Sequence, residues 1–192
     1  EKIRYLQAAE RWCIDLGLTG VQDAGLPTGD IMLIDSLQRA GGLRMPLYVM
    51  VSESPEALDH WLKRGPLETD WLSVRSFKFY SDGALGSRGA ALIEPYSDQP
   101  SQKGLLVTQP DQLTQIMQMT IDAGFQTNVH AIGDLANRLV LDRFEQLVPE
   151  DKRQPSRHRV EHAQIVSPKD IPRFAKLHVL PAMQAVHATS DK

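Results

Sequence analysis

The chain has 192 residues, of which 42% are hydrophobic and 23% are charged, a balance typical of one soluble globular domain with a sizeable core. Its 24 acidic and 21 basic side chains leave a net charge of −3, and no lysine and arginine stripe forms, which argues against a nucleic-acid partner. We find no signal peptide, lipidation motif or apolar run long enough to span a membrane, so we expect a soluble, cytoplasmic protein.

The first predicted element is an amphipathic helix over residues 3–17, because its apolar side chains recur at helical spacing. The single cysteine, Cys13, lies in this helix and is expected to be a small buried side chain. One cysteine cannot form an internal disulfide, which agrees with a reducing compartment. The chain opens inside this helix without an initiator methionine and stops at HATSDK, so we expect a piece of a longer protein.

Six strand-like runs then alternate with helical patterns. The strand-like runs cover residues 18–25, 44–52, 74–83, 125–134, 157–166 and 178–188. The helical patterns cover residues 30–42, 54–65, 109–124, 134–148 and 167–177. Asp134 is placed to N-cap its helix, and Gly41, Gly65 and Gly124 stand where helices end. This alternation predicts an α/β fold made of βα units with a parallel sheet.

Polar residues at the ends of successive predicted strands favour a barrel over an open sheet, because barrel enzymes place catalytic groups at each strand's carboxyl end. These residues are Asp23, Ser52, Lys78 with Asp82, His130, His162 and Gln184. Six βα units of roughly 30 residues fall short of the ~250 residues of a complete (β/α)8 barrel. We therefore predict a partial TIM barrel, strands two to seven, with residues 1–192 forming a single domain.

Two histidines give the strongest chemical signal. His130 in NVHAIGD and His162 in VEHAQ each end a predicted strand, so equivalent barrel positions would aim both imidazoles into one mouth. Neutral imidazoles suit Zn²⁺ or a similar divalent ion. The alternative, that each is a hydrogen-bonded structural histidine, stays open at this point.

Lys78 is unusual because it stands inside the apolar run FKFY, where a buried ammonium is costly unless it is paired or chemically altered. Three interpretations are open. It forms a Schiff base, it pairs with Asp82, or carbon dioxide carboxylates its amine to give an anionic oxygen donor that bridges two metal ions.

Several motifs together resemble the YtcJ-like branch of the amidohydrolase superfamily. They are LGLTGVQDAG, FKFYSDGALGSRGAAL followed by EPYSD, VHAIGD, RHRVEHAQIV and PAMQAVHATSD, in the family's order. The resemblance implies a TIM-barrel hydrolase that holds one or two divalent ions, zinc being typical. Carried over by motif, Lys78 would be a strand-four metal ligand, often carboxylated, His130 the strand-five ligand and His162 the strand-six ligand.

The chain departs from that pattern in two ways. None of its six histidines forms the H-x-H pair that the family carries on strand one. No candidate stands for the strand-eight aspartate that acts as the base, since Asp191 resembles the motif after strand seven. We therefore name no catalytic residue and expect the chain alone to bind metal weakly and to hydrolyse little or nothing.

The resemblance implies a small-molecule substrate, hydrolysed at an amide-type, non-peptide C–N bond or a related bond by a metal-activated water. Asp82 and Arg88, in the loop after the fourth strand, are candidates for substrate binding, with a loop-organising ion pair of Arg88 with Asp82 or Glu94 as the alternative. Two other functions remain possible. The first is a lyase or aldolase that uses Lys78 as a Schiff base, and the second is a non-catalytic barrel remnant that self-associates through exposed edges.

Overall fold

The computed structural model describes residues 1–190, so Asp191 lies outside the described residues. The chain divides into two compact units, Glu1–Lys78 and Phe79–Lys192, with the boundary inside one strand. That the two units act as a single domain stays a prediction.

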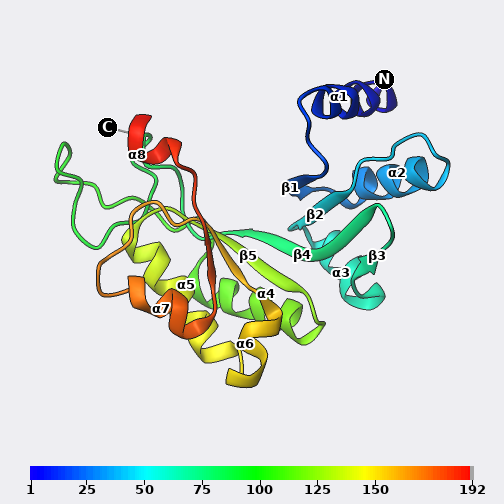
Figure 1. The fold of residues 1–192 in the computed structure, drawn as a ribbon. Coiled ribbons are helices and arrows are strands. Elements are labelled where there is room, and N and C mark those ends of the chain that lie inside the picture. The colour runs from blue at the N-terminus through cyan, green and yellow to red at the C-terminus, as the bar shows by residue number, and fades with distance from the viewer. Residues whose placement is uncertain (191–192) are drawn as a thin grey trace. The chain divides into compact units, whose positions relative to one another are not determined.

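The first unit alternates helices with strands (Figure 1). Its elements are α1 (Lys2–Asp15), β1 (Val21–Leu26), α2 (Thr28–Arg39), β2 (Leu47–Ser52), α3 (Pro55–Arg64), β3 (Leu67–Glu68) and most of β4 (Leu72–Tyr80). β1 pairs with β2 and β2 pairs with β4, both in parallel, whereas the short β3 pairs antiparallel with β4. The strands that were predicted here are therefore confirmed, and β3 was not anticipated.

The strands of this unit carry continuous apolar runs because both of their faces are covered. Val49 and Val51 on β2 and Phe77 on β4 are fully buried.

Helix α3 begins and ends where the sequence predicts. The Ser54 hydroxyl accepts the N–H of Ala57 at 3.0 Å, and the helix stops at Gly65, which has a φ of 79°.

Helix α1 forms as predicted, but none of its side chains is fully buried. Trp12 is 70% exposed and Cys13 is half-buried, so the prediction of a buried cysteine was wrong. The reason is loose packing, because Leu6 and Cys13 line a cavity of about 210 Å³ that separates the helix from Val21 on β1.

The second unit repeats the same pattern (Figure 1). Its elements are the end of β4, α4 (Pro110–Asp122), β5 (Gln126–Ala131), α5 (Asp134–Leu147), α6 (Glu150–Ser156), β6 (Arg159–His162), α7 (Ile171–Leu177), β7 (Leu180–Ala182) and α8 (Val186–Ser190). β5, β6 and β7 pair in parallel, in that order. Helices α4 and α5 pack on β5, and α7 packs on β7. These helices cover one face of the sheet. Val129 and Val160 of the strands and Leu141 and Phe144 of α5 are therefore fully buried.

Two local predictions for this unit need correction. Gly133, not Asp134, is the N-cap of α5, and Asp134 is the first helical residue. The Asp134 carboxylate instead accepts the N–H of Ile93, in the connection between β4 and α4, at 2.9 Å. The run over residues 178–188 gives only a three-residue strand, and its end forms helix α8. The polar segment of α6 was not predicted as a helix.

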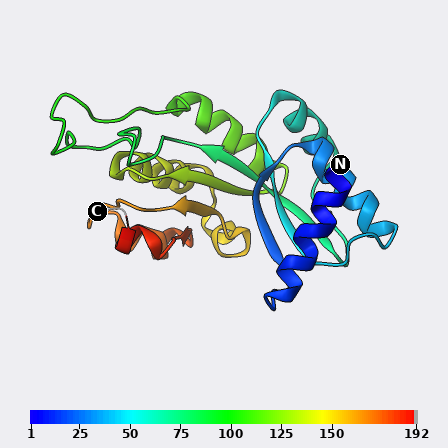
Figure 2. The same ribbon diagram turned by 90° about the horizontal axis from the view of Figure 1, so that it is seen from above.

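The segment between β4 and α4 is the longest connection in the second unit and extends as a loop from the end of β4 (Figure 2). It returns to its starting point, because the Val107 N–H donates to the Ser81 carbonyl at 2.9 Å. Across residues 1–190, no helix combines the length and the apolar character needed to cross a bilayer.

Candidate functional site

The two histidines singled out from the sequence meet at the carboxyl ends of β5 and β6. The ring centroids of His130 and His162 are 4.6 Å apart, and the ring planes meet edge to face at 72°. Each ring also contacts an aromatic neighbour within the second unit: Tyr80 lies 5.5 Å from His130, and His187 lies 5.9 Å from His162. The structure therefore places the two imidazoles together, as predicted.

Regular strand geometry alone would not bring these rings together. In the parallel pairing of β5 with β6, His130 stands opposite Glu161, and His162 stands opposite Ala131. Register partners share a face of the sheet and successive residues alternate, so His130 and His162 start on opposite faces. The backbone of His162 has a φ of 77°, and that of Ala163 has a φ of 43°. This left-handed turn ends β6 and redirects the His162 ring towards His130.

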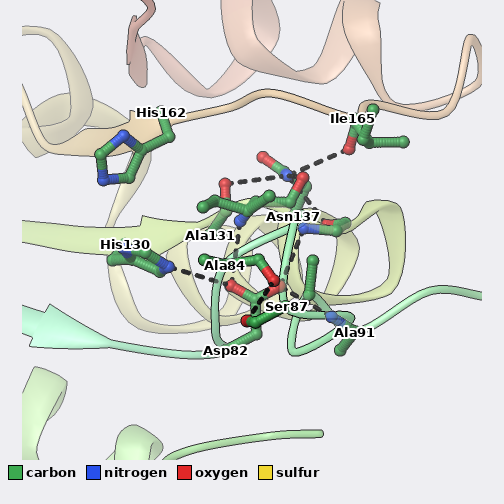
Figure 3. A network of polar contacts seen from close by, with 12 residues as sticks. Asp82, Ala84, Ser87, Ala91, His130, Ala131, Asn137, His162 and Ile165 are labelled. Carbon is green, nitrogen blue, oxygen red and sulfur yellow. Dashed lines mark hydrogen bonds and ion pairs between the residues drawn. The ribbon is translucent and has the colours of Figure 1, made fainter. Parts of the chain in front are cut away.

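Asp82 joins this site from the loop after β4 (Figure 3). Its carboxylate is 1% exposed and accepts three backbone N–H groups, from Ala91 at 2.9 Å, Ile132 at 2.9 Å and Gly133 at 2.8 Å. One carboxylate oxygen also lies 3.5 Å from Nε2 of His130. Burial raises the pKa of Asp82, and the hydrogen bonds from the backbone offset only part of that shift.

Asn137 ties together the connections that follow β5 and β6 (Figure 3). Its fully buried amide nitrogen donates to the carbonyls of Ala131 at 3.1 Å, Gly133 at 2.9 Å and Ile165 at 3.2 Å. The Ile165 N–H in turn donates to the Ile132 carbonyl at 2.8 Å. These bonds fix the loop that follows His130 against the loop that follows His162.

Residues 83–89, the glycine-rich loop, belong to the connection between β4 and α4. The two ends of this loop lie against each other. The Gly83 N–H donates to the Gly89 carbonyl at 3.1 Å, and a Cβ on Gly83 would lie 3.1 Å from the Gly89 Cα. Both residues have negative φ, so close approach of the backbone, not a left-handed turn, accounts for these glycines.

Arg88 is bound within the same loop. Its guanidinium contacts both carboxylate oxygens of Asp98, at 2.8 and 3.3 Å, with neither Asp82 nor Glu94 as the ion-pair partner. The backbone of Arg88 is left-handed, with a φ of 57°. A substrate-binding role for Arg88 stays a prediction, as it does for Asp82.

Lys78 belongs to the first unit and lies on β4 opposite Ser52 of β2. Lys78 is 3% exposed. If Gly25 carried a side chain, its Cβ would lie 3.7 Å from both Cβ and Cγ of Lys78. A glycine at that position leaves room for the lysine stem. The lysine is therefore buried, as its apolar context predicts, and its role as a metal ligand stays a prediction.

The face of β5 and β6 that carries His130 also carries several polar side chains. Asn128 is fully buried, and its register partner Arg159 forms an ion pair with Glu161 at 2.8 Å. Thr127, on the opposite face, bonds to Thr120 of α4, which identifies that face as the one covered by helices. Glu161 therefore points away from the helices and lies on the same face as His130.

The donor atoms that the second unit brings together fit part of a metal site. Imidazole is a preferred ligand of zinc and related ions, and metal-binding histidines usually use their second nitrogen for a hydrogen bond. Nδ1 of His162 has such a bond, at 3.0 Å from Oε1 of Gln184. Within residues 1–190, no three His, Cys, Asp or Glu side chains converge on one point, and the role of His130 and His162 as metal ligands stays a prediction.

Two residues of this site carried a weak sequence signal. Gln184 was noted as a polar strand-end residue, but nothing in the sequence paired it with His162. Asn137 was not predicted as a site residue. Its place among the apolar residues of LANRLV is nevertheless typical of a buried amide side chain that forms hydrogen bonds.

Comparison with known proteins identifies the family. The amidohydrolase family profile matches residues 1–192. The chain belongs to the amidohydrolase family. It is 32% identical to the putative amidohydrolase YtcJ of Bacillus subtilis over 97% of its length, and 30% identical to the protein LONG AFTER FAR-RED 3 of Arabidopsis thaliana over 100% of its length. The resemblance drawn from the motifs is thereby confirmed.

Solved structures agree with this assignment. Crystal structures of uncharacterised metal-dependent hydrolases from Pyrococcus furiosus and Pyrococcus horikoshii match 98% of this chain, with TM-scores of 0.87 and 0.86 and 31% sequence identity in both cases. This amidohydrolase chain spans 35% of the length of the two curated relatives and 39% and 38% of the two solved chains. Its α/β fold is that of a partial (β/α)8 barrel, as the strand and helix pattern predicted.

Proposed function

We propose that this chain forms part of the active site of a metal-dependent hydrolase that acts on amide-type, non-peptide C–N bonds or related bonds of small molecules. In this proposal His130 and His162 are metal ligands, and Lys78 is a further ligand, carboxylated on its amine. The solved relatives from Pyrococcus are described as metal-dependent hydrolases, which supports the reaction class.

The observation that carries the proposal is the pair of imidazoles whose ring centroids lie 4.6 Å apart at the carboxyl ends of β5 and β6. Strand ends of this kind are where barrel enzymes gather catalytic groups. The left-handed backbone that turns the His162 ring towards His130 is costly for a residue with a side chain, which supports a functional role for that ring.

Each residue of the site then has a defined task. A bound divalent ion, zinc being the one best suited to imidazole ligands, would lower the pKa of a water molecule towards neutrality and polarise the substrate carbonyl. His130 and His162 would hold that ion from one side. A carboxylate oxygen of Asp82 lies 3.5 Å from Nε2 of His130, where it would help to orient that imidazole.

The loop after β4 would border the substrate. Backbone hydrogen bonds from Ile132 and Gly133 to Asp82 hold the start of this loop against the connection between β5 and α5. Arg88 is held in place by Asp98. We propose that Arg88 lines the entrance for a substrate with a carbonyl or carboxylate group, and that the buried Asp82 contributes to substrate binding by holding this loop in place.

An alternative is a lyase or aldolase in which Lys78 forms a Schiff base. Burial of Lys78 agrees with either role, because a desolvated amine is easier to deprotonate and so more nucleophilic. Borohydride reduction in the presence of simple aldehydes and ketones distinguishes them. The hydrolase proposal predicts no covalent adduct on Lys78, and a peptide carrying the reduced substrate at Lys78 would favour the lyase.

Isothermal titration with Zn²⁺ tests the ligand assignment. The chain is expected to bind zinc weakly, because it has no H-x-H pair and its ligand set is incomplete. His130→Ala and His162→Ala should each abolish the binding, whereas His60→Ala, which removes an exposed imidazole of the first unit, should leave it unchanged. Binding that survives both of the first two substitutions would overturn the proposal.

A further inference from the structure

The segment that follows β7 approaches His162 with two side chains. Oε1 of Gln184 lies 3.0 Å from Nδ1 of His162, and the ring of His187 lies 5.9 Å from the His162 ring. The two residues are joined by a backbone bond, because the His187 N–H donates to the Gln184 carbonyl at 3.1 Å. One short stretch of chain therefore contacts the same imidazole twice.

The contact with Gln184 determines where the proton of a neutral His162 resides. A carboxamide oxygen only accepts hydrogen bonds, so the hydrogen between Oε1 and Nδ1 must belong to the imidazole. Neutral imidazole has one N–H, and with Nδ1 protonated the lone pair is left on Nε2. Nε2 is then the nitrogen available to a ligand.

The backbone of His162 makes such a contact useful. The ring is redirected by a φ of 77°, and β6 ends at this residue, so sheet pairing does not fix the ring direction. The ring is half-buried and needs a fixed partner to remain edge-on to His130. A hydrogen bond to Nδ1 supplies one, since it restricts rotation about the Cβ–Cγ bond.

We propose that Gln184 is a positioning residue that holds His162 as the Nδ1–H tautomer and presents Nε2 as its metal-binding atom. This inference rests on the proposed function for its purpose, but the tautomer itself is a property of the metal-free chain. Gln184 touches no reacting atom and acts only through His162.

The test is the tautomeric state of His162, read from imidazole ¹⁵N and ¹³C NMR shifts of the metal-free chain at a pH where the ring is neutral. The wild-type chain should show the Nδ1–H form. Gln184→Ala should shift His162 towards the Nε2–H form, and Gln184→Glu, which keeps an acceptor oxygen, should restore Nδ1–H. Gln154→Ala, at an exposed glutamine of α6, is the matched control and should change nothing.

A wild-type His162 in the Nε2–H form, or a Gln184→Ala variant that retains Nδ1–H, would overturn the inference whatever the metal does. Zinc titration of the same variants gives the second readout, in which Gln184→Ala should weaken binding roughly 10- to 100-fold. Zinc binding that does not depend on His162 would count against the proposed function instead, so the two failures are distinguishable.

Discussion

The carboxylate of Asp82 lies 3.5 Å from Nε2 of His130 while it accepts backbone N–H groups from both residues that follow β5, Ile132 and Gly133. The same side chain therefore connects the loop after β4 to the strand end that carries the histidine. Its third hydrogen bond, from Ala91, holds the far side of the glycine-rich loop.

Asp82→Asn should destabilise the chain by about 1–3 kcal/mol, because a carboxamide supplies one acceptor oxygen where two are used and directs its NH₂ at buried N–H donors. Urea unfolding gives the free energy. Asp98→Asn in the same loop is the control. Asp98 is largely exposed and forms an ion pair with Arg88, so its loss should cost less than about 1 kcal/mol. Equal effects of the two substitutions would contradict the role given to Asp82.

Gly133→Ala should be among the most damaging small substitutions in the second unit. A Cβ at Gly133 would lie 1.9 Å from the Ala91 carbonyl oxygen, so the loop and the start of α5 would have to separate. Overpacking of this kind costs about 1–3 kcal/mol or more. Gly86→Ala meets no atom within 4 Å and should leave the unfolding midpoint nearly unchanged. A Gly133→Ala chain as stable as Gly86→Ala would disprove the packing argument.

Much of this architecture was predictable from the sequence because it depends on local signals. The alternation of apolar runs with helical patterns gave all six parallel strands, and Gly41, Gly65 and Gly124 have the positive φ that a helix end favours. Predictions failed where burial depends on distant segments. Cys13 has the right helical spacing for burial, but the cavity beside α1 leaves it half-covered.

The site was predictable in its main pair and not in its supporting residues. His130 and His162 each stand at a predicted strand end, whereas nothing in the sequence marked His162 for a left-handed backbone, which residues other than glycine adopt only uncommonly. Gln184 is 22 residues from His162 in the chain, and Asn137 is 28 residues from its partner Ile165. Such pairs become visible only once the fold brings them together.

His158 should make the second unit sensitive to acid. Its ring is 3% exposed and stacks on Phe144 with centroids 5.1 Å apart, and Nδ1 accepts the Thr127 N–H at 3.0 Å. Burial lowers the pKa of His158 from 6.5 to about 4. The unfolded chain therefore takes up the proton first, and stability that is complete above pH 6.5 is lost as the pH falls to about 4.

The loss expected from His158 over that window is about 3 kcal/mol, from 1.36 kcal/mol for each pKa unit. Urea unfolding at a series of pH values measures it, and His158→Asn, which keeps an acceptor without a titrating ring, should flatten the curve. Asp82 acts in the opposite sense, because its raised pKa favours the folded state at low pH. A variant curve parallel to that of the wild type would show that His158 does not titrate as described.

Helix α1 and the residue that caps its C-terminus, Leu16, expose an apolar surface that should promote self-association of the isolated chain. Tyr5, Trp12 and Leu16 are 65%, 70% and 67% exposed, which is unusual for side chains of this size. Light scattering should detect dimers or larger species, and Trp12→Gln should shift the population towards monomer. A wild-type chain that is monomeric at every concentration would contradict this expectation.

The central claim, that His130 and His162 hold a divalent metal ion, is tested most directly by anomalous diffraction at the zinc edge from crystals saturated with Zn²⁺. The account predicts a peak about 2.0–2.1 Å from one nitrogen of each imidazole, with Nε2 as the donor of His162. Zinc bound elsewhere on the chain, with the two imidazoles left unligated, would contradict it.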